Sequence, residues 1–358
     1  MRALIVGNQP LGSPGGVEAV CRAWVDALTM CGFDTRYLSA SDALSRTAAD
    51  GWPLKRYWRS AAEVAATRLA AARAPAGLVV SNGSIGWGVR GSKASLHMYH
   101  GTYRGQAQVV GDAMSRRGRM KIGRIDGGLL ERAAGRSKLC LANSWSTAAE
   151  VGRWYGHECE VLWPPVDVDR FRPGDGGRGP RGPFAPGDRP RGVFIGAGRP
   201  MKGERVAFEV MRRTPNIDWL VVGDKPGTPV PPLVSHIGSF DPREMPDLFR
   251  ATDVLLVTSP YEPFGMVVAE AMACGTPVVC GPSGASDLLL STDLSDWRVG
   301  SSDDVEAFAA VVNRLVLDKE GARVRALEHG RPLVVEHLSL ARWRNRVSAL
   351  VERALRAG

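Results

Sequence analysis

The chain has 358 residues, of which 44% are hydrophobic and 23% are charged. This length exceeds what one hydrophobic core usually serves, so we predict two domains. No apolar run is long enough to cross a bilayer as a helix. The six cysteines show no Cys-x-x-Cys spacing and most lie among apolar residues, so we expect them to be small hydrophobic residues of a reduced, cytoplasmic protein.

The formal net charge of +9 is concentrated in the first half of the chain. Residues 1–172 hold 23 Lys and Arg against 14 Asp and Glu, whereas residues 173–358 hold 23 of each kind. This asymmetry predicts an anionic partner for the first half, either a phosphorylated molecule or an acidic membrane surface. The alternative is surplus charge that serves solubility alone.

The first half reads as alternating strands and helices. An apolar strand at 2–7, a Gly- and Pro-rich turn, a helix at 19–30 and a strand at 35–38 predict a β-α-β unit. The later elements of this half are predicted as strands at 78–80, 95–99 and 139–142, a long helix at 54–74, a basic helical stretch at 106–136 and a helix that opens at Asn143-Ser144.

A Gly- and Pro-rich stretch divides the chain, because 12 of the 20 residues at 173–192 are Gly or Pro. A second alternating series follows it, so the sequence predicts an α/β protein with two doubly wound, Rossmann-like domains that face each other across a cleft. The predicted parts are an N-terminal domain at 1–165, a linker at 166–192, a C-terminal domain at 193–337 and a last helix at 338–358.

The most informative segment holds two glutamates eight positions apart, Glu262 and Glu270. Pro260, Pro263 and Gly265 predict a loop, and the residues from 266 to 273 predict a helix that ends before Gly275. The backbone N–H groups of residues 264–266 therefore lie at a helix start, which attracts anions. A sugar joined to a diphosphate needs this combination of acceptors for hydroxyls and donors for phosphate.

This segment resembles the Glu-x7-Glu signature of the family-4 retaining glycosyltransferases, which have the GT-B fold. The resemblance implies that Glu262 contacts hydroxyls of the donor sugar and that Glu270 holds the ribose of the nucleotide. It also implies donor contacts from the backbone at Phe264, Gly265, Met266 and Val267, and a C-terminal helix that crosses back to the first domain.

The N-terminal half carries two further motifs of that family. Gly15-Gly16-Val-Glu matches a loop whose N–H groups approach the donor diphosphate, and His100 matches a residue that reaches the 6-hydroxyl of the sugar and the reaction centre. Gly12, Gly15 and Gly16 do not have the Gly-x-Gly-x-x-Gly spacing of a dinucleotide site, which weighs against a NAD-dependent oxidoreductase.

Arg199 and Lys202 follow the first strand of the second half, where cations would neutralise a diphosphate. The family usually separates this Arg and Lys by five positions and here the separation is three, so Lys202, with its intact Lys-Gly step, is the firmer prediction. The resemblance places Ile237 near the nucleobase. Asp167-Val-Asp169 looks like an Asp-x-Asp metal motif, but its place beside the linker predicts no metal site.

The resemblance therefore implies a metal-independent, retaining hexosyltransferase that uses a UDP-sugar or GDP-sugar and no cofactor. Its acceptor would be a small molecule, a glycan or a lipid-linked molecule, and a nucleic acid is not expected. A basic run at 116–124 could lie on the anionic inner face of the cell membrane, with a solvated helix face as the alternative. A sugar-nucleotide-binding protein without activity and a NAD-dependent oxidoreductase stay as alternatives.

Overall fold

The computed structural model describes residues 1–45, 55–109, 115–136, 138–174, 184, 187–232 and 234–357. The chain divides into two compact units, the first formed by residues 1–165 and 340–358 and the second by residues 166–339. The chain enters the second unit at Val166, whose N–H donates to the Leu338 carbonyl oxygen at 2.7 Å, near the point where the chain leaves that unit. Most of the Gly- and Pro-rich stretch at 173–192 lies outside the described residues.

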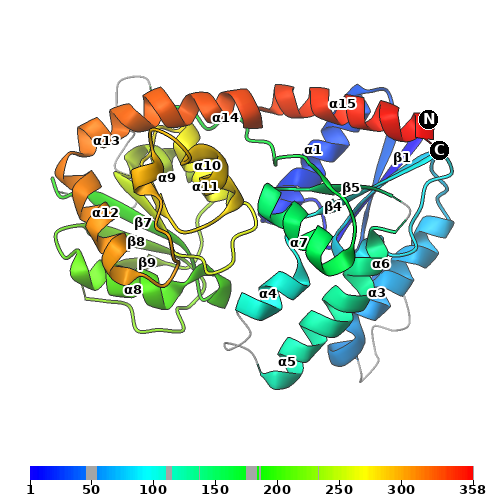
Figure 1. Ribbon diagram of the computed structural model, residues 1–358, viewed down its shortest axis with the longest axis horizontal. Coiled ribbons are helices and arrows are strands. Elements are labelled where there is room, and N and C mark those ends of the chain that lie inside the picture. The colour runs from blue at the N-terminus through cyan, green and yellow to red at the C-terminus, as the bar shows by residue number, and fades with distance from the viewer. Residues whose placement is uncertain are drawn as a thin grey trace. The chain divides into compact units, whose positions relative to one another are not determined.

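The first unit is built on a six-stranded parallel sheet with the strand order β2-β1-β3-β4-β5-β6. Its strands run through the lower-numbered part of the chain (Figure 1): β1 (Arg2–Gly7), β2 (Asp34–Ser39), β3 (Leu78–Asn82), β4 (Ala94–Tyr99), β5 (Leu139–Ala142) and β6 (Glu160–Val161). The chain moves from β1 outward to β2 and then returns to β3 on the other side of β1. The direction of winding therefore reverses between β1 and β3.

The helices of the first unit are α1 (Gly16–Met30), α2 (Ala40–Ser45), α3 (Lys55–Ala72), η2 (Gly83–Gly86), α4 (Tyr103–Val109), α5 (Arg116–Met120), η4 (Lys121–Glu131), α6 (Arg132–Ala134), α7 (Trp145–Tyr155) and α15 (Leu340–Ala357). The described residues of the basic helical stretch predicted at 106–136 form several helices. The Ser115 side chain caps α5 by accepting a hydrogen bond from the Gly118 N–H, and the glycines of η4 weaken a regular α-helix.

The last helix belongs to the first unit, which confirms the expectation that it returns to the first domain. In α15, Trp343, Val347 and Leu350 are buried in one hydrophobic core with residues of α1 and of the sheet. Apolar residues recur along α15 with a helical period, whereas most of its arginines are exposed. Residues from both ends of the chain therefore stabilise the same core.

The second unit contains a five-stranded parallel sheet with the order β11-β10-β7-β8-β9. Its strands are β7 (Arg191–Ala197), β8 (Asp218–Gly223), β9 (Ser235–Ile237), β10 (Val254–Val257) and β11 (Val278–Cys280). Its helices are η5 (Pro200–Lys202), α8 (Glu204–Arg213), η6 (Pro242–Glu244), α9 (Met245–Ala251), α10 (Met266–Ala273), α11 (Gly284–Leu289), η7 (Ser295–Trp297), α12 (Val305–Leu317), α13 (Lys319–Arg325), η8 (Ala326–Gly330) and α14 (Arg331–Leu338). The two parallel sheets with their helices confirm the predicted α/β class.

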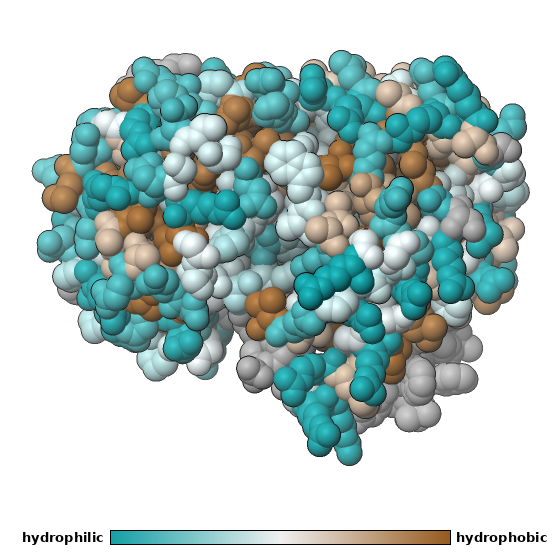
Figure 2. All heavy atoms as spheres, in the orientation of Figure 1, coloured by the Kyte–Doolittle hydropathy of each residue, from teal (hydrophilic) through white to brown (hydrophobic). Residues whose placement is uncertain are grey.

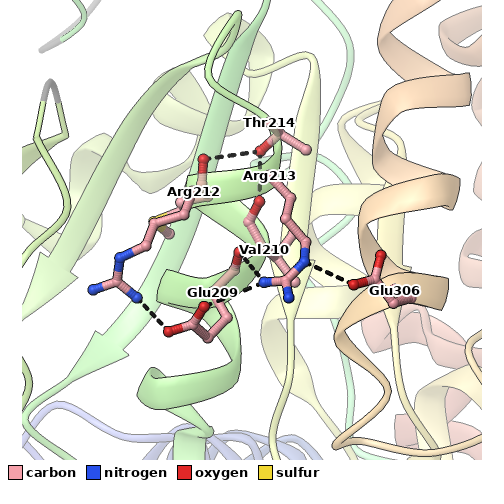
Figure 3. Close-up of polar contacts among 7 residues, drawn as sticks. Glu209, Val210, Arg212, Arg213, Thr214 and Glu306 are labelled. Carbon is pink, nitrogen blue, oxygen red and sulfur yellow. Dashed lines mark hydrogen bonds and ion pairs between the residues drawn. The ribbon is translucent and has the colours of Figure 1, made fainter.

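Helix α8 is held at both of its ends. At its C-terminal end, Arg213 Nε contacts Glu306 Oε1 of α12 at 2.9 Å, and another guanidinium nitrogen of Arg213 contacts Glu209 Oε2 at 3.2 Å (Figure 3). The Thr214 hydroxyl donates to the Val210 carbonyl oxygen at 2.9 Å and so satisfies a group of the last turn. Its N-terminal end forms part of the site described below.

The basic stretch of the first unit is largely hydrophilic on its surface. Figure 2 shows mainly hydrophilic side chains where Figure 1 places α5, although Met120 and Leu129 are more than half exposed. Within the described parts of the chain, no helix combines the length and the hydrophobicity needed to span a membrane.

Candidate active site

The second sheet has its own reversal of winding, at the border between β7 and β10. Strands β8 and β9 extend the sheet on one side of β7, and β10 and β11 extend it on the other side. The loops after β7 and β10 therefore separate, and the crevice outside the strand ends at such a point is where open α/β sheets bind ligands. Lys202 follows β7 and Glu262 follows β10, so both lie at this position.

Lys202 and Glu262 form an ion pair at this reversal point, with Lys202 Nζ 2.6 Å from Glu262 Oε2. The same oxygen accepts a hydrogen bond from the Ser259 hydroxyl at 3.1 Å. The side chains keep 28% and 11% of their surface exposed, so the pair is largely removed from water but still reachable. A charge-assisted contact of this kind fixes both side chains in one geometry.

The backbone around Lys202 is equally constrained. Gly203 has φ +71°, and a Cβ atom there would lie 2.0 Å from the Thr258 carbonyl oxygen, so only glycine fits. The Thr258 hydroxyl donates to the carbonyl oxygens of Gly203 and Lys202, at 3.0 and 3.2 Å. The loops after β7 and β10 are thus joined directly behind the ion pair.

Helix α10 begins where the sequence predicts, at Met266, and ends at Ala273. Its N-cap is Gly265 with φ +98°, and a Cβ atom there would lie 3.3 Å from Glu262 Cγ. The first N–H groups of an α-helix have no partner within the helix, so those of Met266 and Val267 are available to an anion. Glu262 therefore lies beside a helix start, as the spacing of the motif predicts.

Glu270 is the fifth residue of α10 and is partly buried. Burial raises the pKa of its carboxyl group to about 7, and the positive charge of Arg170 opposes that rise. The carboxylate consequently changes its charge near neutral pH. An ionised carboxylate in this position can accept hydrogen bonds from hydroxyl groups.

Arg199 contacts a different carboxylate from the one that Lys202 contacts. Its side chain is 68% exposed, and Nε lies 4.0 Å from Asp224 Oδ2 in the loop after β8. The two cations predicted to act together thus have different carboxylate neighbours. Ile237 is the last residue of β9, at the edge of the sheet, and is partly buried.

Glu204 was not predicted as a site residue, although it follows the Lys-Gly step. Its carboxylate is 8% exposed and accepts hydrogen bonds from the N–H groups of Gly198 and Thr228, both at 2.7 Å. It therefore joins the loop after β7 to the loop after β8. An acidic residue directly after the Lys202-Gly203 step was the available signal.

The predicted site residues of the first half lie in the first unit. Gly15 caps α1 and Gly16 begins it, so the Gly-rich loop follows β1 at the winding reversal of that sheet. His100 follows β4, and its Nε2 lies 2.9 Å from Asn82 Oδ1 at the end of β3. Burial lowers the pKa of His100 to about 4, so the ring is neutral at neutral pH.

Asp167 participates in its own turn, because its Oδ1 accepts a hydrogen bond from the Arg170 N–H at 3.1 Å. No group of three or more His, Cys, Asp or Glu side chains able to hold a metal ion occurs among the described residues.

Comparison with known proteins connects this geometry to one class of enzyme. Residues 180–331 match the family model described as "Glycosyl transferases group 1". The chain is 28% identical over 216 residues to a D-inositol 3-phosphate glycosyltransferase of Mycobacterium marinum, covering 55% of this chain and 45% of the relative. It is 32% identical over 187 residues to D-inositol 3-phosphate glycosyltransferase 2 of Catenulispora acidiphila, covering 45% and 43%. The matches thus span less than half the length of these relatives.

Solved structures show the same fold. Sucrose-phosphate synthase from Thermosynechococcus elongatus aligns with a TM-score of 0.80 and 19% identity over 100% of both chains. Anabaena Alr3699/HepE, solved in complex with UDP and glucose, aligns with a TM-score of 0.69 and 15% identity, covering 98% of this chain and 99% of that chain. The fold of this protein is therefore that of the GT-B glycosyltransferases.

Proposed function

We propose that this protein is a retaining glycosyltransferase that transfers a sugar from a nucleoside diphosphate sugar to an acceptor hydroxyl without a metal ion. The observation that carries the proposal is the 2.6 Å pair of Lys202 and Glu262 at the winding reversal of the second sheet. A cation for phosphate and a carboxylate for hydroxyls are placed together there, in the segment that matches the glycosyltransferase family model.

In this proposal the second unit binds the donor. Lys202 and the first N–H groups of α10 contact the diphosphate, Glu262 contacts hydroxyls of the sugar, and Glu270 accepts hydrogen bonds from the ribose. A UDP-sugar is the first donor to test, because Anabaena Alr3699/HepE was solved with UDP-glucose. Arg199 and Ile237 are assigned weaker roles, since Arg199 is exposed and Ile237 lies on the edge strand.

The chemistry requires one bond to break and one to form at the anomeric carbon. The bond from that carbon to the phosphate oxygen breaks, and Lys202 with the helix N–H groups stabilises the charge that develops on the diphosphate. The acceptor oxygen forms its bond on the same face of the sugar, and its proton passes to the leaving phosphate oxygen. Lys202 must release Glu262 in part when the diphosphate binds, which frees the carboxylate for the sugar hydroxyls.

A phosphorylated polyol is the acceptor to test first. The related mycobacterial proteins are named for D-inositol 3-phosphate, and the excess positive charge of residues 1–172 suits an anionic acceptor. Glycan and lipid-linked acceptors form the other arms of the same screen. The roles of Gly15, Gly16 and His100 in the first unit are part of the proposal and rest on the resemblance of their motifs.

The test is a transfer assay with UDP-sugars and GDP-sugars, with the anomeric configuration of the product read by NMR and with a chelator in a parallel reaction. Glu262→Gln is expected to lower kcat/KM by about 100-fold or more. The matched control is Glu306→Gln, because Glu306 pairs with Arg213 and its side chain is 79% exposed; this variant should keep full activity. Full activity of Glu262→Gln would refute its role. Donor binding without transfer would favour a non-catalytic protein, and binding of NAD alone would favour an oxidoreductase.

A further inference from the structure

The carboxyl ends of three strands in the first unit meet at Asn82. This residue ends β3 and is 2% exposed. Its Nδ2 donates to the carbonyl oxygen of Val6 in β1 at 3.0 Å, and its Oδ1 lies 2.9 Å from Nε2 of His100, directly after β4. One side chain therefore links the ends of β1, β3 and β4.

The two contacts of Asn82 determine which nitrogen of His100 carries the proton. A carbonyl oxygen only accepts hydrogen bonds, so the atom of Asn82 that faces Val6 must be the amide nitrogen. The amide oxygen then faces His100 and can only accept as well. Nε2 of His100 must therefore be protonated, and because the ring is neutral, Nδ1 carries the lone pair.

The chain beyond His100 is fixed by two buried or partly buried carboxylates. The Thr102 hydroxyl donates to Glu150 Oε2 at 2.6 Å, and the Tyr103 N–H donates to Glu131 Oε2 at 2.8 Å. Strand β4 holds the backbone before His100 and these two contacts hold it after His100, so the ring stays beside Asn82. His100 remains partly exposed, and Nδ1, which carries the lone pair, is the ring nitrogen able to accept a hydrogen bond.

We propose that Asn82 is a positioning residue that holds His100 as its Nε2–H tautomer, so that Nδ1 accepts a hydrogen bond from a sugar hydroxyl. The proton on Nε2 follows from the contacts of Asn82, and the lone pair on Nδ1 follows because the ring is neutral. The identity of the ligand as a sugar hydroxyl rests on the proposed function. The opposite tautomer would present an N–H group and would reject a hydroxyl that must donate its proton.

The direct test is an NMR measurement of the tautomer in the full-length protein labelled with ¹⁵N-histidine. The signals of His100 are assigned by their loss in His100→Gln. The expected result for the unaltered protein is a protonated Nε2 and an unprotonated Nδ1 across neutral pH. A protonated Nδ1 would overturn the inference.

Two variants separate the acceptor role of Asn82 from its structural role. Asn82→Asp and Asn82→Ala both lose the hydrogen bond to Val6, but only the aspartate keeps an oxygen for Nε2–H. We expect Asn82→Asp to retain the Nε2–H tautomer and Asn82→Ala to show a mixture of both tautomers. Asn143 is a buried asparagine directly after the neighbouring strand β5. Its variant Asn143→Ala is the control and should leave the tautomer of His100 unchanged. An unchanged tautomer in Asn82→Ala would reduce Asn82 to a structural link.

Kinetics supply a second and independent readout. Asn82→Ala should lower kcat/KM about tenfold, the effect expected for a lost hydrogen-bond partner, and should cost little further in a His100→Ala background, because the two residues act as one unit. Equal losses in both backgrounds would contradict the inference. If no donor supports transfer, the proposed function fails while the NMR result on Asn82 still stands.

Discussion

Trp24 of α1 and Trp343 of α15 meet edge to face, with ring centroids 5.1 Å apart and an angle of 74° between the planes. They come from near the two ends of the chain and are 0% and 2% exposed, respectively. Edge-to-face pairs add to the stabilisation that burial of each ring provides. The last helix is therefore an integral part of the first unit.

Truncation of this contact should destabilise the first unit. Trp343→Ala removes a fully buried indole and leaves a cavity against Trp24, so we expect a loss of about 3–5 kcal/mol in the free energy of unfolding. Urea unfolding followed by far-ultraviolet circular dichroism measures it. Trp87→Ala, at a tryptophan of the same unit that is 40% exposed, should cost less than about 1 kcal/mol. Similar losses in both variants would show that α15 contributes little to this core.

Lys202 should matter to turnover more than to folding. Lys202→Ala removes the cation that is proposed to stabilise the departing diphosphate, so we expect kcat/KM to fall by about 100- to 1000-fold. Lys202→Arg keeps the positive charge and should recover part of that loss. Steady-state kinetics with the selected donor give the comparison.

The control for Lys202 is Lys319→Ala, at the first residue of α13 in the same unit, which should keep the activity of the unaltered protein. Thermal unfolding of both variants checks that the fold persists. If Lys202→Ala retained its kcat/KM, the cation would have no part in phosphate stabilisation and the ion pair with Glu262 would be purely structural.

The local part of this site could be predicted from the sequence, and the non-local part could not. Pro263, Gly265 and Gly275 punctuate the chain strongly, so the loop and the bounds of α10 follow from neighbouring residues alone. The pairing of Lys202 with Glu262 depends on strand order, which a single sequence does not reveal. Asn82 was missed for the same reason, since one partner lies in β1 and the other directly after β4.

The first unit should lose stability as the pH rises, through Glu131. Burial raises the pKa of this carboxyl group to about 8, while the Tyr155 hydroxyl and the Tyr103 N–H oppose the rise and the acidic groups of Glu150 and Asp126 add to it. Because the pKa is raised in the folded state, protonated Glu131 stabilises the fold. This stabilisation is complete below the ordinary pKa of about 4.5 and is lost progressively as the pH rises through about 8.

The variant Glu131→Gln isolates this effect, because its neutral side chain can accept the same hydrogen bonds and has no proton to lose. We expect the stability of Glu131→Gln, relative to the unaltered protein, to increase steadily between pH 5 and pH 8, as measured by urea unfolding at each pH. The surface substitution Glu352→Gln in α15 accounts for the general effect of removing one charge. A difference that does not change with pH would show that Glu131 keeps its charge in the folded protein.

Donor binding should weaken as the pH falls through 7, because of Glu270. The pKa of this carboxyl group is raised to about 7 by burial, and only its ionised form can accept hydrogen bonds from both ribose hydroxyls without donating one. Calorimetric titration with a nucleotide sugar is the suitable measurement. Both phosphates of a nucleotide sugar keep their charge around pH 7, so the ligand itself adds no pH dependence. Glu270→Gln should bind more weakly at pH 8 and show almost no dependence on pH, whereas Glu306→Gln should behave as the unaltered protein. If the affinity for the nucleotide sugar rose on acidification, the protonated form of Glu270 would be the binding form, and its carboxyl group would donate a hydrogen bond to the ribose.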